Sequence, residues 1–164
     1  MITQKRVKEV FYYLEGNLYW RSNLGTRAKA GTIAGNKNAG GYYNVQVDKK
    51  QYYIHRLIYL YFYGYMPEFI DHKHGSSVGN YLWNLRSCTR SQNMANKGMN
   101  KSNTSGFRGV FKKSSKWIAR ITVKGKSIQI GVYFSAKDAS DAFELKAKEL
   151  HGKFYNPIQI KQTR

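Results

Sequence analysis

The first third of the chain shows short alternations of apolar and polar residues, which predict small elements joined by turns. Residues 3–10 are expected to form a helix that begins at an N-cap threonine, Thr3. Two aromatic-rich stretches, 11–14 and 17–21, flank Glu15 and Gly16 and predict a tight hairpin. Residues 22–41 are rich in Gly, Asn and Lys and lack any periodicity, so they are expected to form a loop.

A second hairpin is predicted from residues 42–47 and 52–54, which are rich in Tyr and Val. The apolar stretch 55–63 then predicts a buried helix, because it is long enough for a helix and is followed by Gly64 and Pro67. The first 66 residues are therefore expected to combine hairpins with helices.

The last third of the chain has the clearest pattern. Residues 106–112, 116–123 and 127–133 are rich in aromatic and β-branched residues and predict three strands. A helix is expected to begin at Ser135 as N-cap and to end at Gly152. Its apolar stripe consists of Ala139, Ala142, Phe143, Ala147 and Leu150. The predicted fold class is α+β, with three antiparallel strands packed on one helix at the C-terminal end.

The composition indicates a folded protein that binds a polyanion. Of its 164 residues 41% are hydrophobic and 15% aromatic, too many for a disordered polycation, yet the formal net charge is +19. The longest apolar run, Leu57–Met66, is too short to cross a membrane, and the N-terminus does not look like a secretory signal. Cys88 is the sole cysteine, so no disulfide framework is possible. We expect a cytoplasmic protein, in the bacterial host cell if a phage encodes it.

The positive charge is concentrated at the two ends. Residues 1–66 carry ten basic and three acidic residues, a net charge of +7, and residues 99–164 carry fourteen and four, a net charge of +10. Residues 67–98 carry four and two, a net charge of only +2, and hold two of the four histidines. We therefore expect the ends to bind the partner and the middle to carry the chemistry.

The middle segment contains residues suited to cleaving a phosphodiester. Asp71 offers a hard oxygen ligand for Mg²⁺, and His72 beside it titrates near neutral pH. Adjacent strand residues point to opposite sides, so both can serve one site only where the strand ends, as Gly75 suggests. The alternative is structural, because Asp-His pairs are common in loops and Asn residues are common in turns and caps. The glycines at 35–41 lack the Lys-Ser/Thr of a phosphate loop, so no nucleotide cofactor is expected.

The order and spacing of residues 42–97 resemble the HNH homing-type endonucleases of phages and bacteria. The matching positions are Gly41-Tyr42-Tyr43-Asn44-Val45, His55-Arg56-Leu57, Pro67, Asp71-His72, Gly75, Asn80, Asn84-Leu85-Arg86, Gln92-Asn93 and Asn96. The family has an Asp at the position of His74 and an Asn at the position of Gly79. For His74 the alternatives are a phosphate contact and a solvated side chain, and for His55 a hydrogen-bonding role is favoured over direct catalysis.

The resemblance implies a ββα-metal fold. It further implies that Asp71 and Asn93 bind one divalent cation, Mg²⁺ or Mn²⁺, that His72 is the general base and that Asn84 fixes the loop that orients His72. Arg56 is expected to contact DNA.

The C-terminal third, residues 103–156, resembles the AP2 DNA-binding domain. The matching stretches are Ser105-Gly106-Phe107-Arg108-Gly109-Val110, Lys116–Ile121, Gly131-Val132-Tyr133, Ala139–Ala147 and His151-Gly152-Lys153. The family places its three-stranded sheet in the major groove and its helix behind the sheet. Arginine can pair with guanine, so Arg108 and Arg120 are the candidates for reading bases. Contacts with the DNA backbone are expected from Lys112, Lys113, Lys124 and Lys126, while Trp117 either contacts DNA or packs in the core.

Together these observations predict a site-specific, homing-type DNA endonuclease that nicks DNA as a monomer or a transient dimer. The expected organisation is a nuclease region at 1–97, with hairpins over 11–54 and a core over 55–97, a linker at 98–105, an AP2-like domain at 106–156 and a tail at 157–164. The alternative is a DNA-binding regulatory protein whose nuclease core is inactive. An RNA-directed nuclease is less favoured, because the major groove of an RNA helix excludes a sheet.

Overall fold

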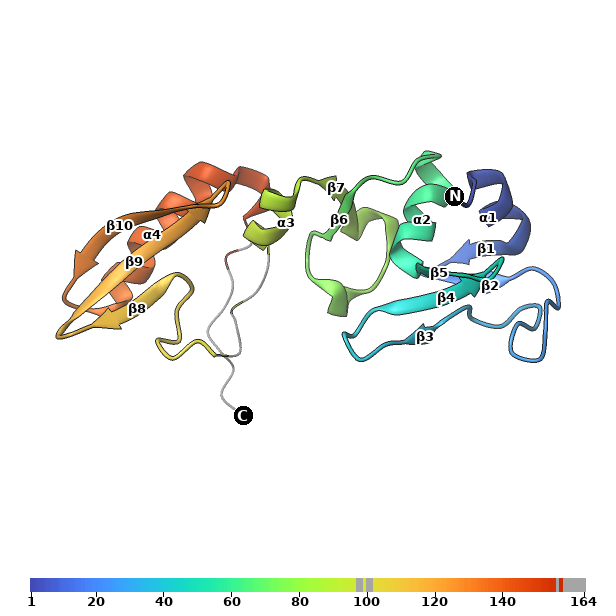
Figure 1. The fold of residues 1–164 in the computed structure, drawn as a ribbon, viewed down its shortest axis with the longest axis horizontal. Coiled ribbons are helices and arrows are strands. Elements are labelled where there is room, and N and C mark those ends of the chain that lie inside the picture. Colours follow the sequence, from blue (N-terminus) through green and yellow to red (C-terminus); the bar gives the residue numbers. More distant parts are fainter. Residues whose placement is uncertain (97–98, 100–101, 156, 158–164) are drawn as a thin grey trace. The chain divides into compact units, whose positions relative to one another are not determined.

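The computed structural model describes residues 1–96, 99, 102–155 and 157. Parts of two expected segments, residues 98, 100 and 101 of the linker and 158–164 of the tail, lie outside the described residues. The chain forms two compact units, Met1–Cys88 and Thr89–Arg164, which are described separately below (Figure 1). No helix among the described residues is long and apolar enough to span a membrane.

The first unit begins with the predicted helix and hairpin. Helix α1 (Gln4–Val10) starts where Thr3 Oγ1 accepts a hydrogen bond from Arg6 N at 3.2 Å, and strands β1 (Phe11–Leu14) and β2 (Asn17–Trp20) pair in antiparallel fashion. The turn residue Glu15 has a φ of 47° and is followed by Gly16. These predictions are confirmed.

A three-stranded sheet follows, in the order β3-β4-β5. Strands β4 (Tyr43–Val47) and β5 (Lys50–Tyr53) form the predicted second hairpin, with its turn at Asp48 and Lys49. Strand β3 (Asn36–Lys37) lies in the segment that was expected to be entirely loop. A strand of only two residues is too short to show an alternation of apolar and polar positions, so the sequence pattern could not predict β3.

Helix α2 (Ile54–Tyr63) is the centre of the first core and ends at Gly64, whose φ of 77° is left-handed. The short hairpin of β6 (Phe69–His72) and β7 (Leu85–Cys88) follows it. The fully or nearly fully buried side chains of this core include Val7, Val10, Phe11, Leu18, Leu57, Ile58 and Leu85. The loop between β6 and β7 contains two short 3₁₀ turns, Ser76–Val78 and Leu82–Asn84.

The second unit begins with helix α3 (Arg90–Asn96). Its sheet, in the order β10-β9-β8, consists of β8 (Val110–Lys113), β9 (Lys116–Val123) and β10 (Lys126–Tyr133). Helix α4 (Ala136–His151) begins where Ser135 Oγ accepts from Asp138 N at 3.0 Å, and Gly152 is its C-cap. The predicted antiparallel sheet packed on one helix is confirmed, and so is the α+β class.

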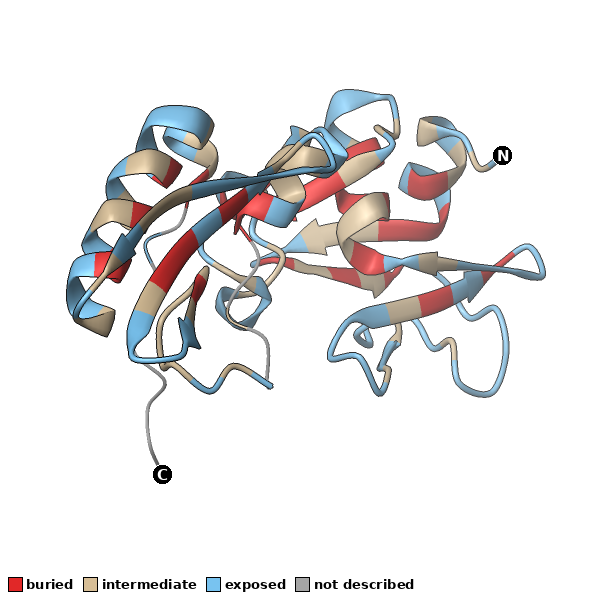
Figure 2. Cartoon of the chain, turned by 60° about the vertical axis from the view of Figure 1, so that its left-hand side comes forward, coloured by how far each residue is buried: buried red, intermediate tan, exposed pale blue. Residues whose placement is uncertain are grey.

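Alternation along β9 divides the sheet into two faces. Ala119 and Ile121 pack with Phe143 of α4 in the second core, and the buried positions of β9 and α4 are visible in Figure 2. The opposite face, called the outer face below, carries Phe111, Lys113, Lys116, Ile118, Arg120 and Gln129. Arg120 is exposed there, with its guanidinium 4.8 Å from the ring centre of Phe111.

Candidate active site

Asp71 and His72 occupy the last two positions of β6, and both are buried. Their exposed fractions are 5% and 7%. The strand ends at His72, and Gly75 then adopts a φ of 86°, so the chain turns directly after the pair. The predicted strand end is therefore present, and each side chain has its own set of partners.

The Asp71 carboxylate is paired across the hairpin with Arg86. The two residues are register partners in β6 and β7, and Arg86 Nε and Nη2 both donate to Asp71 Oδ2, at 2.8 and 2.6 Å. A buried carboxylate needs such a partner, because its desolvation is costly. The sequence matched Arg86 to the family motif but gave it no role; cross-strand pairing supplies that role.

His72 is held by a residue whose function the sequence did not indicate. Its Nε2 lies 2.9 Å from Asn80 Oδ1. Because the amide oxygen accepts, this bond places the ring proton on Nε2 and leaves the lone pair on Nδ1, the nitrogen that can take a proton. Asn80 therefore sets the tautomer that a general base requires. Its place in the motif was visible in the sequence, but its contact with His72 depends on how the loop folds back.

Asn84 ties both ends of that loop together. Its side chain is fully buried; Oδ1 accepts from His74 N at 2.9 Å, and Nδ2 donates to Gly75 O at 3.2 Å and Gly79 O at 2.9 Å. Its backbone oxygen also accepts from Lys73 N at 2.8 Å. This geometry supports the expected role of Asn84 in fixing the loop that orients His72.

A group of aromatic rings lies against His72. The His55 ring centre is 5.3 Å from that of His72, and Tyr42 and Tyr53 both contact His55. Burial lowers the pKa of His55 to about 3, with smaller contributions from the nearby His72 and Arg56. His55 is therefore neutral at physiological pH and packs beside the candidate base without adding charge.

Two basic side chains next to the β6–β7 hairpin, Arg56 and Lys73, bind backbone carbonyls. Arg56 donates to Pro67 O at 2.7 Å and to Glu68 O at 3.1 Å, and so holds the segment that leads into β6. Lys73 Nζ donates to Trp83 O at 2.7 Å. Trp83 is 56% exposed, and its ring contacts those of Tyr81 and of the exposed His74. The exposed aromatic side chains of this loop had no predicted role.

Asn93 lies on α3 of the second unit. The helix begins with a reciprocal cap in which Gln92 N donates to Thr89 Oγ1 at 3.2 Å and Thr89 N donates to Gln92 Oε1 at 2.8 Å. Asn93 N donates to Thr89 O at 2.9 Å. The use of Asn93 as a metal ligand stays a prediction.

The predicted DNA-contacting residues of the C-terminal unit occupy different environments. Arg120 and Lys113 lie on the outer face, and Lys124 and Lys126 are exposed at the turn between β9 and β10. Three others have protein contacts. Trp117 is half-buried against the second core, and Lys112 Nζ lies 5.8 Å from the centre of the Trp117 ring. Arg108 donates a hydrogen bond to Met94 O of α3.

The donor types of the predicted ligands, a carboxylate and an amide oxygen, are compatible with Mg²⁺. Among the residues that the structure describes, no three His, Cys, Asp or Glu side chains come together as a metal site. Mg²⁺ does not require such a cage, since it commonly uses one or two carboxylates, water and substrate phosphates. Asp71 supplies a hard carboxylate beside a strand end, and an amide oxygen such as that of Asn93 belongs to the same ligand class.

Comparison with known proteins identifies the segment that contains these residues. Residues 52–95 match the family model of the HNH endonuclease, whereas no curated protein and no solved structure matches the chain. The match includes Asp71, His72, Asn80, Asn84 and Asn93. Enzymes of this family hydrolyse phosphodiester bonds in DNA and generally use a divalent metal. Residues 52–95 of this chain are therefore an HNH endonuclease domain.

Proposed function

We propose that this protein is a site-specific DNA endonuclease of the homing type that nicks its target. The observation that carries the proposal is the buried His72, whose Nε2 is bonded to Asn80 so that Nδ1 is basic, and which directly follows Asp71 at the end of β6. A DNA-binding protein with an inactive core has no need to hold a histidine in one tautomer.

The residues of the loop support a hydrolytic mechanism. His72 Nδ1 accepts a proton from the attacking water, whose oxygen forms a bond to phosphorus while the bond from phosphorus to the 3′ oxygen breaks. The products are a 5′-phosphate and a 3′-hydroxyl. Asn80 holds the imidazole through Nε2, and Asn84 holds the loop that carries Asn80. Asp71 and Asn93 would hold Mg²⁺ or Mn²⁺, which when bound offsets the negative charge on the leaving oxygen.

The second unit supplies a surface for DNA, and we propose that it acts as an AP2-like reading module. A three-stranded sheet can enter the major groove, and the exposed Arg120 on the outer face can pair with guanine. Lys113, Lys124 and Lys126 are exposed and suited to phosphate contacts, which fix position without carrying sequence. The high positive charge of residues 99–164 agrees with this role.

The proposed activity is tested with supercoiled plasmid that carries candidate target DNA. With Mg²⁺ or Mn²⁺ the protein should convert supercoiled plasmid to open circles at a defined position, and with EDTA it should bind without cutting. Mapping of the ends by primer extension should show one cleaved strand. Sequence-specific binding without cleavage under any divalent metal would favour the inactive regulatory protein instead.

Base reading by the outer face predicts different effects for two basic residues. Arg120→Ala should lower affinity for the target but not for random DNA, because each specific base pair contact discriminates by about 1–3 kcal/mol. Lys126→Ala should weaken binding to both DNAs alike and reduce the salt dependence of the affinity. Fluorescence anisotropy at several salt concentrations measures both. Equal losses on target and random DNA for Arg120→Ala would contradict the base-reading role.

A further inference from the structure

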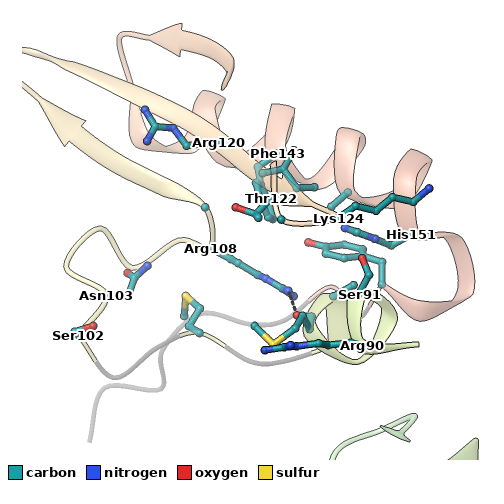
Figure 3. Close-up of a pocket in the computed structure, with 18 residues that line it drawn as sticks. Arg90, Ser91, Ser102, Asn103, Arg108, Arg120, Thr122, Lys124, Phe143 and His151 are labelled. Atoms are coloured by element: carbon teal, nitrogen blue, oxygen red, sulfur yellow. Dashed lines mark hydrogen bonds between the residues drawn. The ribbon is translucent and has the colours of Figure 1, made fainter. Parts of the chain in front are cut away.

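Arg108 connects the C-terminal sheet to α3. Its Nη2 donates to Met94 O at 3.0 Å, a bond drawn as a dashed line in Figure 3. Met94 directly follows Asn93 in the same helix, and its carbonyl belongs to the last described turn of that helix. Arg108 therefore binds the last described turn of the helix that carries the proposed metal ligand.

The environment of Arg108 holds its side chain toward α3. The guanidinium carbon lies 5.7 Å from the ring centre of Tyr155, whose hydroxyl donates to Glu144 Oε1 at 2.6 Å. Burial lowers the pKa of Arg108, while the nearby Tyr155 and Glu144 partly oppose that change. Nη1 is buried without a hydrogen-bond partner among the described residues, an arrangement that costs free energy and that a solvated surface arginine avoids.

The backbone beside Arg108 is fixed as firmly as its side chain. Gly109 has a φ of 66°, and a Cβ there would collide with the Phe143 ring and lie 2.7 Å from Arg120 O. Gly109 O also accepts from Arg120 N at 2.8 Å. The chain at 108–109 is thereby locked between β9 and α4, so the base of the Arg108 side chain has little freedom to swing toward the outer face.

A cavity of about 780 Å³ lies beside this connection. Its lining includes Met94 and Ala95 of α3, Thr122 of β9 and Phe143 of α4, and Arg108 extends through this region toward α3 (Figure 3). Side chains around an open cavity lose dispersion contacts, so packing alone holds α3 less firmly than a filled core would. The hydrogen bond and the ring contact of Arg108 thus carry a larger share of the positioning.

We propose that Arg108 is a positioning residue for metal binding: it fixes the orientation of α3 and of Asn93, and it does not read bases. The proposal rests on the proposed function, because it assigns Asn93 to the metal. In this arrangement the DNA-binding module itself holds one part of the catalytic apparatus. Disturbing Arg108 should therefore weaken metal use while it leaves sequence preference unchanged.

The test compares Arg108→Ala with Arg108→Lys and with the matched control Arg120→Ala. For Arg108→Ala, the Mg²⁺ concentration that gives half-maximal nicking should rise by about tenfold or more, the range seen when the support of a metal ligand is removed. Arg108→Lys, which can still donate to Met94 O, should recover part of that loss. At saturating DNA, Arg120→Ala should reach half-maximal nicking at the wild-type Mg²⁺ concentration, because its side chain lies on the outer face, although its affinity for the target is lower.

Two measurements are independent of cleavage. Hydrogen exchange should show faster exchange of the α3 amides in Arg108→Ala than in the wild type, and electron paramagnetic resonance should show weaker Mn²⁺ binding. Anisotropy in Ca²⁺ should show unchanged preference for the target. The proposal is overturned if α3 protection and Mn²⁺ binding equal those of the wild type, or if sequence preference is relaxed as in a base reader. If the wild type does not nick DNA, the proposed function fails, but the α3 exchange data still decide whether Arg108 anchors the helix.

Discussion

His72→Ala should reduce nicking by about 10²–10⁴-fold, the usual contribution of a positioned general base. The substitution removes the imidazole whose ring proton Asn80 fixes on Nε2 and whose Nδ1 is proposed to accept the proton of water. DNA binding should change little, because the basic surfaces of both ends remain. Single-turnover nicking and binding in EDTA measure the two effects separately.

His74→Ala is the matched control for this prediction. His74 is the same residue type in the same loop, but it is exposed and its ring contacts Trp83. It should nick at nearly the wild-type rate. The nicking rate of Asn80→Ala should lie between those of His72→Ala and His74→Ala, because the imidazole of His72 remains but loses the acceptor that sets its tautomer. Wild-type activity in a folded His72→Ala protein, checked by its thermal unfolding, would exclude His72 as the base.

Asn84→Ala should have the second largest effect and should lower both stability and activity. It leaves the His74 amide and the carbonyls of Gly75 and Gly79 without their partner, and each such buried group costs about 1–3 kcal/mol if water cannot replace the bond. We expect the free energy of unfolding of the first unit to fall by about 3 kcal/mol. Nicking should fall at least tenfold, because the loop that carries Asn80 is no longer fixed.

Urea unfolding followed by tryptophan fluorescence measures the first effect, and hydrogen exchange of the His74 amide reports on the loop directly. Asn84→Asp is a near-isosteric comparison that retains an acceptor for His74 N but loses both donated bonds. Compared with Asn84→Ala, it should accelerate the exchange of the His74 amide less. Both variants should lose the hydrogen bonds to Gly75 O and Gly79 O. An unchanged unfolding midpoint for Asn84→Ala would mean that the loop is held by other contacts.

Local patterns were sufficient to predict most elements of this fold. Thr3, Gly64, Ser135 and Gly152 mark helix ends in the sequence, and the structure has a cap at each of them. The aromatic and β-branched residues from Lys116 to Val123 predicted a strand with the bounds that β9 has. These features depend on residues within a few positions of one another, so a linear pattern contains them.

The candidate site was predicted only in part, because some of its contacts join residues that are not neighbours along the chain. The motif indicated Asp71, His72 and Asn84, but not the pairing of Asp71 with Arg86 fifteen residues later or the bond from His72 to Asn80. The first arises from the register of β6 and β7, and the second arises when the loop between these strands folds back. The pairing register and the loop path decide them, and neither follows from residue type alone.

The sequence by itself determined the α+β class, the basic charge at both ends and the order of the HNH residues, because composition and short-range periodicity record these directly. The tertiary structure decided which polar groups meet. Arg108 shows this most clearly, since its motif suggested a base contact and the structure places its guanidinium on Met94 O. Buried polar groups must find partners, and the nearest suitable partner is set by packing between segments that are distant in the chain.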